Sequence, residues 1–391
     1  MSRLLRLLTT MYNFDKIISR ENTANVKYDM RQSYFGSQEV LPMWVADMDF
    51  ETPPFITEAV RKRAAHPVYG YSFRTDQYFQ SITSWLQRRF NWKIEREWIL
   101  FTPGVVPAFN FALQAFTKPG DRIIVQPPVY FPFFNAIRNN GRVQVENQLL
   151  NKDGSYVIDF EDLKEKARDA SMLFLCSPHN PTGRCWTRKE LTELCNICLE
   201  NDVLILSDEI HADLILPPFS HHPTAALSDE IAEKTITCIA PSKTFNIAGL
   251  ATSSVIIRDQ ELREKFEQAV EKVHVAGGNL FGAVASQAGY EHGDQWLDEL
   301  MEYIQGNYDL LKAAIEIEFP QLRLTPLEAT YLCWIDFSRT GLPDDEIRER
   351  LIHKSELGFA HGPIFGNGGE GFQRMNIAAP RVVIEESMER L

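Results

Sequence analysis

Residues 172–183 read MLFLCSPHNPTG, and residues 203–211 read VLILSDEIH. Each segment begins with a short apolar run, typical of a buried strand, and passes directly into polar side chains. Similar runs recur on both sides, separated by amphipathic stretches such as 159–169 and 187–200. Strands that alternate with helices predict a mostly parallel sheet covered by helices on both faces. The predicted strands are 122–126, 142–147, 172–177, 203–207, 235–240 and 253–258.

The rest of the chain predicts a second, smaller domain. Residues 259–318 have helical periodicity, and strand-like runs then return, with one helix at 343–353. Residues 1–50 lack a strong period and are interpreted as an extended arm. We therefore expect a three-layer α/β/α large domain, a small α+β domain and an arm that joins the small domain. The expected ranges are 56–290 for the large domain, 291–391 for the small domain and 1–55 for the arm.

Composition restricts the function. The 391 residues include 53 Asp and Glu against 40 Lys and Arg, a net charge of −13, and no basic run. This charge excludes a nucleic-acid footprint, and no stretch approaches the roughly 20 apolar residues of a membrane helix. Six cysteines in a chain of this size indicate reduced thiols in a cytoplasmic protein. Residues 1–10 resemble a leader without its apolar core, so we interpret them as a misassigned start or a frayed extension.

Two turns at strand ends carry candidate ligand groups. The turn at 102–107 (TPGVVP) leads from a strand into a helix, and free backbone N–H groups at a helix start suit a phosphate. The turn at 177–183 (SPHNPTG) holds Asn180 between two prolines, which would fix the direction of its amide. Taken singly, both sequences are equally typical of structural turns.

Three charged residues occupy comparable places. Asp208 follows an apolar strand, where a buried carboxylate requires a cation, a metal or a protonated nitrogen, unless it caps a helix. Lys243 lies between strands among small and apolar residues, which lowers the pKa of an amine and lets it form an imine with an aldehyde. Arg374, in a later strand-like run, would pair with an acidic side chain or bind a ligand carboxylate. Each is individually compatible with an ordinary structural role.

Taken together, these motifs resemble a known superfamily. SPHNPTG, SDEIH and PSKTFNIAGL (241–250 for the last) occur in the order and spacing of fold-type I pyridoxal-phosphate enzymes of the class I/II aminotransferase superfamily. The resemblance extends from residue 11 onward. LPMWVADMDF (41–50) is its most discriminating part and is similar to the cystathionine β-lyase branch, the MalY/PatB type of carbon–sulfur lyase. The resemblance implies pyridoxal 5′-phosphate (PLP) as cofactor and a small amino acid as substrate.

The resemblance also implies residue roles. Lys243 would hold PLP as a Schiff base and later take the α-proton, and Asp208 would face the pyridine nitrogen. Arg374 would bind the substrate carboxylate. Further expected cofactor contacts are Gly104, Val105, Val106, Tyr130, Asn180, His211, Ser242 and Tyr71, and further expected substrate contacts are Asn180, Trp44, Ala46 and Tyr71. For His211, a packed helix histidine is an equally weighted alternative.

Tyr71 resembles the tyrosine that reaches across a dimer interface in this family, with Tyr69 as the alternative if the register differs. A homodimer with shared sites is therefore expected. The chain departs from the family at Ala240, where many relatives have a serine, and over 246–251, where many have an arginine that grips the phosphate. Ser242 or Thr244 could compensate for these donors.

The reaction that the resemblance implies is α,β-elimination from cystathionine or a related cysteine S-conjugate, giving a thiol, pyruvate and ammonia. The same residues would serve an aminotransferase of small amino acids, which is the near alternative. A non-catalytic regulator on the same scaffold is the distant one.

Two further motifs are interpreted as structural. Cys195 and Cys198 form a C-x-x-C without a second ligand pair, so we expect two thiols on a helix. His221 and His222 are adjacent and are expected on a surface loop, because neighbouring side chains of an extended segment point apart. No metal site is expected.

Overall fold

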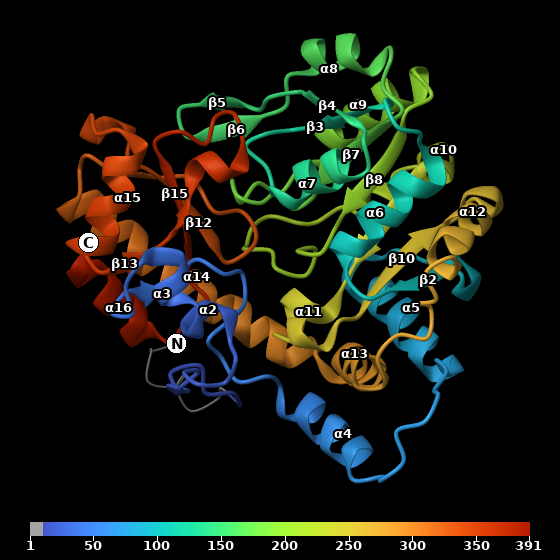
Figure 1. The fold of residues 1–391 in the computed structure, drawn as a ribbon, viewed down its shortest axis with the longest axis horizontal. Helices are drawn as coiled ribbons and strands as arrows, with labels where there is room; N and C mark the ends of the chain where they lie inside the picture. Colours follow the sequence, from blue (N-terminus) through green and yellow to red (C-terminus); the bar gives the residue numbers. More distant parts are fainter. Residues whose placement is uncertain (1–10) are drawn as a thin grey trace.

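The central sheet of the large domain has seven strands in the order β2-β10-β9-β8-β7-β3-β4 in the computed structural model, which describes residues 11–391 (Figure 1). Neighbouring strands from β9 to β4 run parallel, and β10 is antiparallel to both β9 and β2. The predicted mostly parallel sheet is therefore confirmed. The strands are β2 (Ile99–Thr102), β3 (Arg122–Val125), β4 (Val143–Glu146), β7 (Met172–Cys176), β8 (Leu204–Asp208), β9 (Thr235–Ile239) and β10 (Ser253–Ile257).

Strand β7 shows why this sheet needs helices on both faces. All five of its residues are buried. Phe174 points into one core cluster, which includes side chains of α6, α7 and α12, whereas Leu173 and Leu175 point into another, with side chains of α8 and α9. Because side chains of a strand alternate between faces, an all-apolar strand must be covered twice. These helices are α6 (Val105–Phe116), α7 (Pro132–Asn139), α8 (Phe160–Ala167), α9 (Arg188–Glu200) and α12 (Gln260–Glu271).

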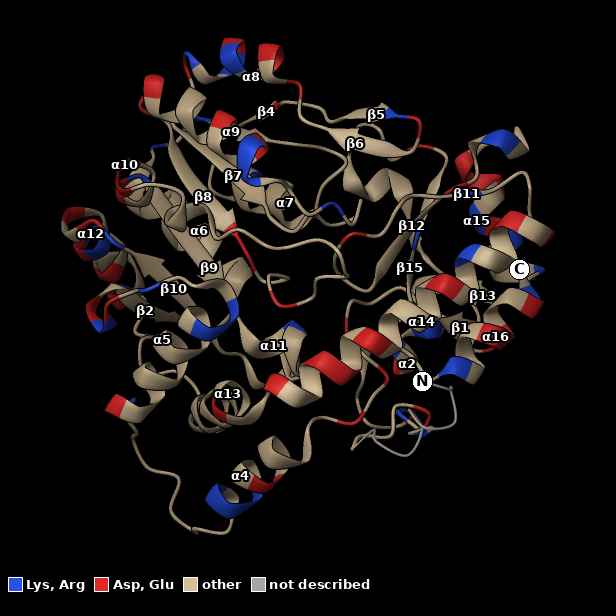
Figure 2. Ribbon diagram, turned by 180° about the vertical axis from the view of Figure 1, so that it is seen from behind, with Lys and Arg blue, Asp and Glu red and all other residues tan. Residues whose placement is uncertain are grey.

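The starts of two of these helices follow the sequence signals. Asp159 caps α8 by accepting from the Asp162 N–H, and Thr187 forms a reciprocal capping box with Glu190 at the start of α9. Charged residues are concentrated on the outer helices, including α12 and the long helix α14, whereas the central strands are almost free of them (Figure 2). Within residues 11–391, no helix combines the length and apolar composition that a membrane crossing requires.

A second sheet of four antiparallel strands, in the order β11-β12-β15-β14, lies in the C-terminal part of the chain. Helix α14 (Asp294–Glu318) leads into it, and its buried side chains belong to the same core as those of the second sheet. The strands are β11 (Arg323–Leu324), β12 (Leu332–Asp336), β14 (Ala360–His361) and β15 (Phe372–Asn376), and the flanking helices are α15 (Asp344–His353) and α16 (Arg381–Arg390).

The N-terminal segment packs on this C-terminal part. Strand β1 (Leu41–Pro42) pairs in parallel with β13 (Leu357–Gly358), and the blue helices α2 and α3 lie beside the red C-terminal elements in Figure 1. The arm is not wholly extended as expected, because Asn25 caps the short helix α2 (Val26–Asp29) and α3 (Arg31–Phe35) follows it. Part of the arm is therefore helical, and part of it is paired with the C-terminal region.

The remaining elements surround this frame. Helices α4 and α13 pack together, and an irregular segment between α4 and α5 extends outward at the edge of the molecule (Figure 1). Their bounds are α4 (Pro54–Ala64), α5 (Asp76–Phe90), α10 (Asp229–Glu233), α11 (Pro241–Thr244), α13 (Leu280–His292), β5 (Leu150–Lys152) and β6 (Ser155–Val157).

Candidate active site

A cavity of about 380 Å³ lies where the carboxyl ends of β7 and β8 meet the arm and strand β15. This is the usual place of a ligand in an open α/β sheet. The cavity collects all but one of the predicted site residues, although they come from seven separate parts of the chain. The predicted residues that line it are Trp44, Ala46, Gly104, Val105, Val106, Tyr130, Asn180, Asp208, His211, Ser242, Lys243 and Arg374.

Asp208 is the last residue of β8, and its carboxylate accepts from the Ile210 N–H at 3.2 Å. Burial raises the pKa of this carboxyl to about 7. Within residues 11–391, no basic side chain forms an ion pair with it. A buried carboxylate in this state gains most from a protonated nitrogen placed against it, because the pair compensates the desolvation of both charges.

Lys243 lies in the short helix α11 and faces the arm. Its Nζ donates to the Ala46 carbonyl at 2.5 Å. Burial lowers the pKa of this amine to about 8, while the Asp47 carboxylate acts in the opposite direction. An amine whose pKa lies near neutral pH can both add to a carbonyl and transfer a proton.

Arg374 projects from β15 and is also buried. Its two terminal nitrogens donate to the Asn180 side-chain oxygen at 2.9 Å and to the Trp44 carbonyl at 2.8 Å. Both acceptors are uncharged, and burial lowers the pKa of the guanidinium to about 10, so the group is still a cation at neutral pH. An unpaired buried cation with a planar fork is suited to a ligand carboxylate.

The amino end of α6 forms another wall of the cavity. Gly104 is its N-cap and supplies no side-chain cap, so the first N–H groups of the helix, at Val105 and Val106, have no side-chain acceptor there. Lys243 and Arg374 are the only Lys or Arg among the lining residues described, and neither belongs to this helix end. Ser242 and Thr252 also line the cavity, and the buried Thr252 hydroxyl has no hydrogen-bond partner among residues 11–391. Backbone N–H groups and hydroxyls are therefore the donors available at this end.

His211 is buried beside the cavity, with its ring 6.2 Å from that of Tyr331. Burial lowers the pKa of the imidazole to about 3, so the ring is neutral. Its Nδ1 has no partner within the described structure. The His211 imidazole is thus packed against its neighbours and also lines the cavity. Its contact with the cofactor stays a prediction.

Tyr71 is the predicted residue that the cavity does not include. It is fully exposed on the segment between α4 and α5, and the neighbouring Tyr69 donates its hydroxyl to the Ala64 carbonyl. The expected contact of Tyr71 with a second protomer stays a prediction.

Four residues at the site were missed by the sequence reasoning. The Tyr331 hydroxyl donates to the Ala46 carbonyl at 3.0 Å, and the Asn376 amide donates to the carbonyls of Val45 and Asp47, each at 2.7 Å. Tyr34 stacks on Trp44 with ring centroids 4.0 Å apart, at the cavity wall. Only Asn376 had a local signal, since it follows Arg374 on the same face of a strand. The fourth missed residue is Thr252.

One structural interpretation is wrong and another is confirmed. His221 does not lie on a surface loop: it is buried, and its Nε2 lies 2.8 Å from a carboxylate oxygen of Glu209. Glu209 follows Asp208 and is itself buried, so its carboxylate requires polar partners; besides His221, the Ser207 hydroxyl and the Thr224 N–H donate to it. Cys195 and Cys198 are free, buried thiols on α9, as expected.

Comparison with known proteins agrees with this geometry. The model of the family "Aminotransferase class I and II" matches residues 38–391. The chain belongs to this family. Among its family relatives, cystathionine beta-lyase PatB of Bacillus subtilis is 45% identical over 381 residues, which cover 97% of this chain and 98% of PatB.

Solved structures of the same family have the same fold. Cystalysin from Treponema denticola, whose crystal structure contains pyridoxal 5′-phosphate, superimposes with a TM-score of 0.95 at 41% identity, covering 97% of this chain and 98% of cystalysin. The PLP-bound C-S lyase from Staphylococcus hominis gives a TM-score of 0.91 at 33% identity, covering 98% of this chain and 97% of that enzyme. The fold class expected from sequence is thereby confirmed.

Proposed function

We propose that this chain is a PLP-dependent carbon–sulfur β-lyase that acts on cystathionine or related cysteine S-conjugates. The observation that carries the proposal is the convergence of Lys243, Asp208 and Arg374 on one cavity, in a chain 45% identical to a cystathionine β-lyase. These three groups are an amine, an acid and a carboxylate receptor, which together match an aldehyde cofactor and an amino-acid substrate.

The polar groups of the cavity fit PLP. Asp208 would face the pyridine nitrogen, Asn180 the phenolic oxygen and Tyr130 the ring, and the N–H groups that begin α6 would hold the phosphate together with Ser242. The buried hydroxyl of Thr252, which has no partner in the described part of the chain, adds a further donor. Bound PLP supplies an electron-withdrawing ring that stabilises negative charge at the α-carbon of the substrate.

The protein side chains then determine which bonds break. Arg374 binds the substrate carboxylate and so orients the α-carbon toward Lys243. The Lys243 amine, with its pKa near 8, takes the α-proton, and the electron pair of the Cβ–S bond leaves with sulfur. With one water consumed overall, the products are a thiol, pyruvate and ammonia. A thiolate leaves readily, which favours substrates with sulfur at the β-carbon.

We also propose a homodimer with shared sites. The segment between α4 and α5 exposes four apolar side chains that pack poorly on their own protomer, with exposed fractions of 60% or more. Such clusters are typical of surfaces that another chain covers. A second copy would bring Tyr71 to the partner cavity. The four side chains are Val68, Tyr69, Tyr71 and Phe73.

The location and domain division are proposals of the same kind. Six free, buried cysteines are consistent with a reducing cytoplasm. The proposed domains are 56–290 for the large domain and 291–391 for the small domain, with 1–55 as the arm. The boundary near 290 lies close to Gly293, where α13 gives way to α14.

The test is a product assay on the purified chain with PLP. We expect pyruvate and ammonia from cystathionine and from S-alkyl cysteines without any keto-acid co-substrate. The Lys243→Ala variant should give none, and borohydride reduction should leave cofactor mass on Lys243 in the native chain only. Amino exchange that requires a keto acid would identify an aminotransferase instead. Binding of PLP without either product would indicate a regulator.

A further inference from the structure

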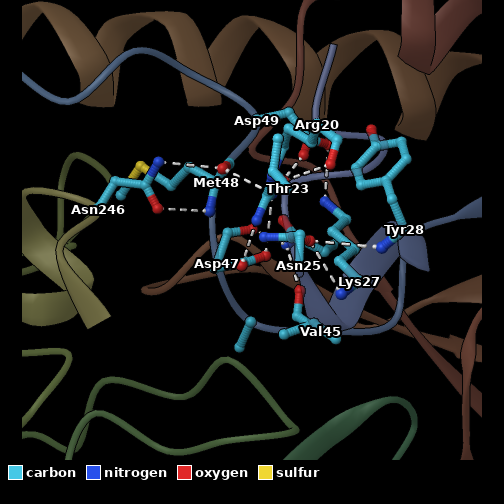
Figure 3. Close-up of polar contacts among 12 residues, drawn as sticks. Arg20, Thr23, Asn25, Lys27, Tyr28, Val45, Asp47, Met48, Asp49 and Asn246 are labelled. Carbon is cyan, nitrogen blue, oxygen red and sulfur yellow. Dashed lines mark hydrogen bonds and ion pairs between the residues drawn. The ribbon is translucent and has the colours of Figure 1, made fainter. Parts of the chain in front are cut away.

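A group of paired charges lies in the arm, outside the cavity itself (Figure 3). Arg20 contacts Asp47 at 2.6 Å and Asp49 at 2.7 Å, and the Lys27 amine contacts the other oxygen of Asp49 at 2.7 Å. The Lys27 side chain is 1% exposed and that of Asp49 6% exposed. Arg20 and Asp47 are half-buried, with side-chain exposures of 15% and 20%. The desolvation of such charges offsets much of their attraction, so the pairs contribute little net stability.

The same stretch of backbone is held from the other side by Asn246. Its side-chain oxygen accepts from the Met48 N–H at 3.0 Å, and its amide donates to the carbonyls of Met48 and Phe50 at 3.0 and 2.9 Å. Asn246 adopts a left-handed backbone conformation, with φ of 56°, only three residues after Lys243. Residues 47–50 are thus fixed between the charges and the loop that carries Lys243. We refer to Arg20, Lys27, Asp47, Asp49 and Asn246 as the arm clamp.

The clamped backbone ends at the acceptor of Lys243. The Ala46 carbonyl precedes Asp47 and receives the Lys243 amine at 2.5 Å and the Tyr331 hydroxyl at 3.0 Å. A carbonyl cannot reorient without moving its backbone. Its position therefore depends on the residues that hold the next peptide groups in place.

We propose that the arm clamp is a set of positioning residues that present the Ala46 carbonyl to the Lys243 amine. None of the five clamp residues lines the cavity. It acts through Ala46, by holding the free amine in one orientation and by stabilising its protonated form, which is the better donor. The inference rests on the proposed PLP chemistry of Lys243.

The positioning role and simple electrostatics predict opposite shifts in the pKa of the Lys243 amine. Removal of the Lys27 cation would raise the pKa of the Lys243 amine if only charge mattered, because like charges repel. If positioning matters, the same change lets Ala46 move away, and the pKa falls. The charged or titratable groups that act on Lys243 or line the cavity with it are Asp47, Asp208, Arg374, His211, Tyr34, Tyr130, Cys176 and, through Ala46, Tyr331. The variants below leave all of them in place.

The experiment measures capture of PLP by the full-length cofactor-free protein as a function of pH. In this step the Lys243 nitrogen adds to the aldehyde carbon, a C=N bond forms and water leaves, which is followed by absorbance. Only the unprotonated amine reacts, so the rate rises with a midpoint that reports the pKa of Lys243. The native protein should show a midpoint near 8, the value to which burial lowers this amine.

Two variants and a matched control test the clamp. Lys27→Met removes the buried cation, and Asn246→Gly removes the amide without changing charge, while glycine tolerates the left-handed conformation. We expect both to lower the midpoint by about one pH unit, the scale of a lost hydrogen bond to a charged group. Lys16→Met is the control, since it breaks an exposed arm ion pair with Glu51 (2.7 Å) and should leave the midpoint unchanged.

Each outcome decides one question. A midpoint that rises in Lys27→Met, or stays unchanged in both clamp variants, overturns the positioning role, even if the melting temperature falls. If Lys27→Met does not fold, Asn246→Gly decides alone, because it alters no charge. A native protein that captures no PLP would instead refute the proposed function.

Discussion

Replacement of Arg374 by lysine tests the assignment of the substrate carboxylate site. Lysine keeps the positive charge but loses the planar fork, so it can no longer donate from two parallel nitrogens. In the structure, those nitrogens are 2.9 Å from the Asn180 side chain and 2.8 Å from the Trp44 carbonyl, and neither acceptor is charged. A bound carboxylate would therefore displace neutral partners and gain the full bidentate contact.

The loss can be estimated from one charge-assisted hydrogen bond. Such a bond contributes about 1.5–3 kcal/mol, which corresponds to a fall of about 10- to 150-fold in kcat/KM. Because the carboxylate is bound before and during reaction alike, most of the change should appear in KM. The assay is steady-state pyruvate formation from an S-alkyl cysteine, with the PLP absorbance recorded for the native enzyme and the variant.

The matched control is Arg184→Lys. Arg184 is also buried, but it pairs with Glu190 and Glu328 at 2.9 and 3.0 Å and does not line the cavity. This variant should lose stability and keep KM. The reasoning is refuted if Arg374→Lys leaves KM within a few fold of the native value, or if the two variants change KM alike.

Three further predictions follow from burial and exposure. Burial lowers the pKa of His179 to about 3. Since the unfolded imidazole takes up a proton near pH 6.5, the free energy of unfolding falls as the pH drops below that value. His179→Gln should reduce this slope by about 1.4 kcal/mol per pH unit, measured by urea unfolding at several pH values. An equal slope in both proteins would contradict this. Tyr34→Ala removes the ring stacked on Trp44. The KM for S-benzyl cysteine should therefore rise about fivefold, while the KM for S-methyl cysteine stays constant. Equal changes in both KM values would exclude a role of Tyr34 in the pocket for the substrate side chain. Tyr71→Phe should weaken PLP binding about tenfold in equilibrium dialysis. The melting temperature of the cofactor-free protein should not fall, because Tyr71 is fully exposed within its own protomer. An unchanged affinity for PLP would exclude Tyr71 from the site.

The central sheet could be predicted because its signals are local. An apolar run such as 172–176 has to be buried on both faces, and the polar residues that follow it lie at the sheet edge wherever the strand goes. Since parallel strands share that edge, Asn180 and Asp208 had to come close together. The caps at Asp159 and Thr187 are equally local, because each bonds a residue three positions further along the chain.

The arm could not be predicted in this way. Its short helices lack a hydrophobic period. His221 was likewise expected on the surface because adjacent side chains of an extended segment point apart, and its partner Glu209, twelve residues earlier, gives no local signal. A buried polar pair leaves no local pattern, since each member is an ordinary polar residue until the fold removes it from water.

The amino-acid sequence by itself determined the layered fold, the cofactor class and the identity of the reactive amine, acid and carboxylate receptor. Only the tertiary structure decided how the amine is held. Ala46 contributes a backbone carbonyl, which every residue type has, and it meets Lys243 across 197 residues and Tyr331 across 285. A contact made by a backbone carbonyl, between residues so far apart in the sequence, depends on packing alone. It therefore becomes visible only when the chain is folded.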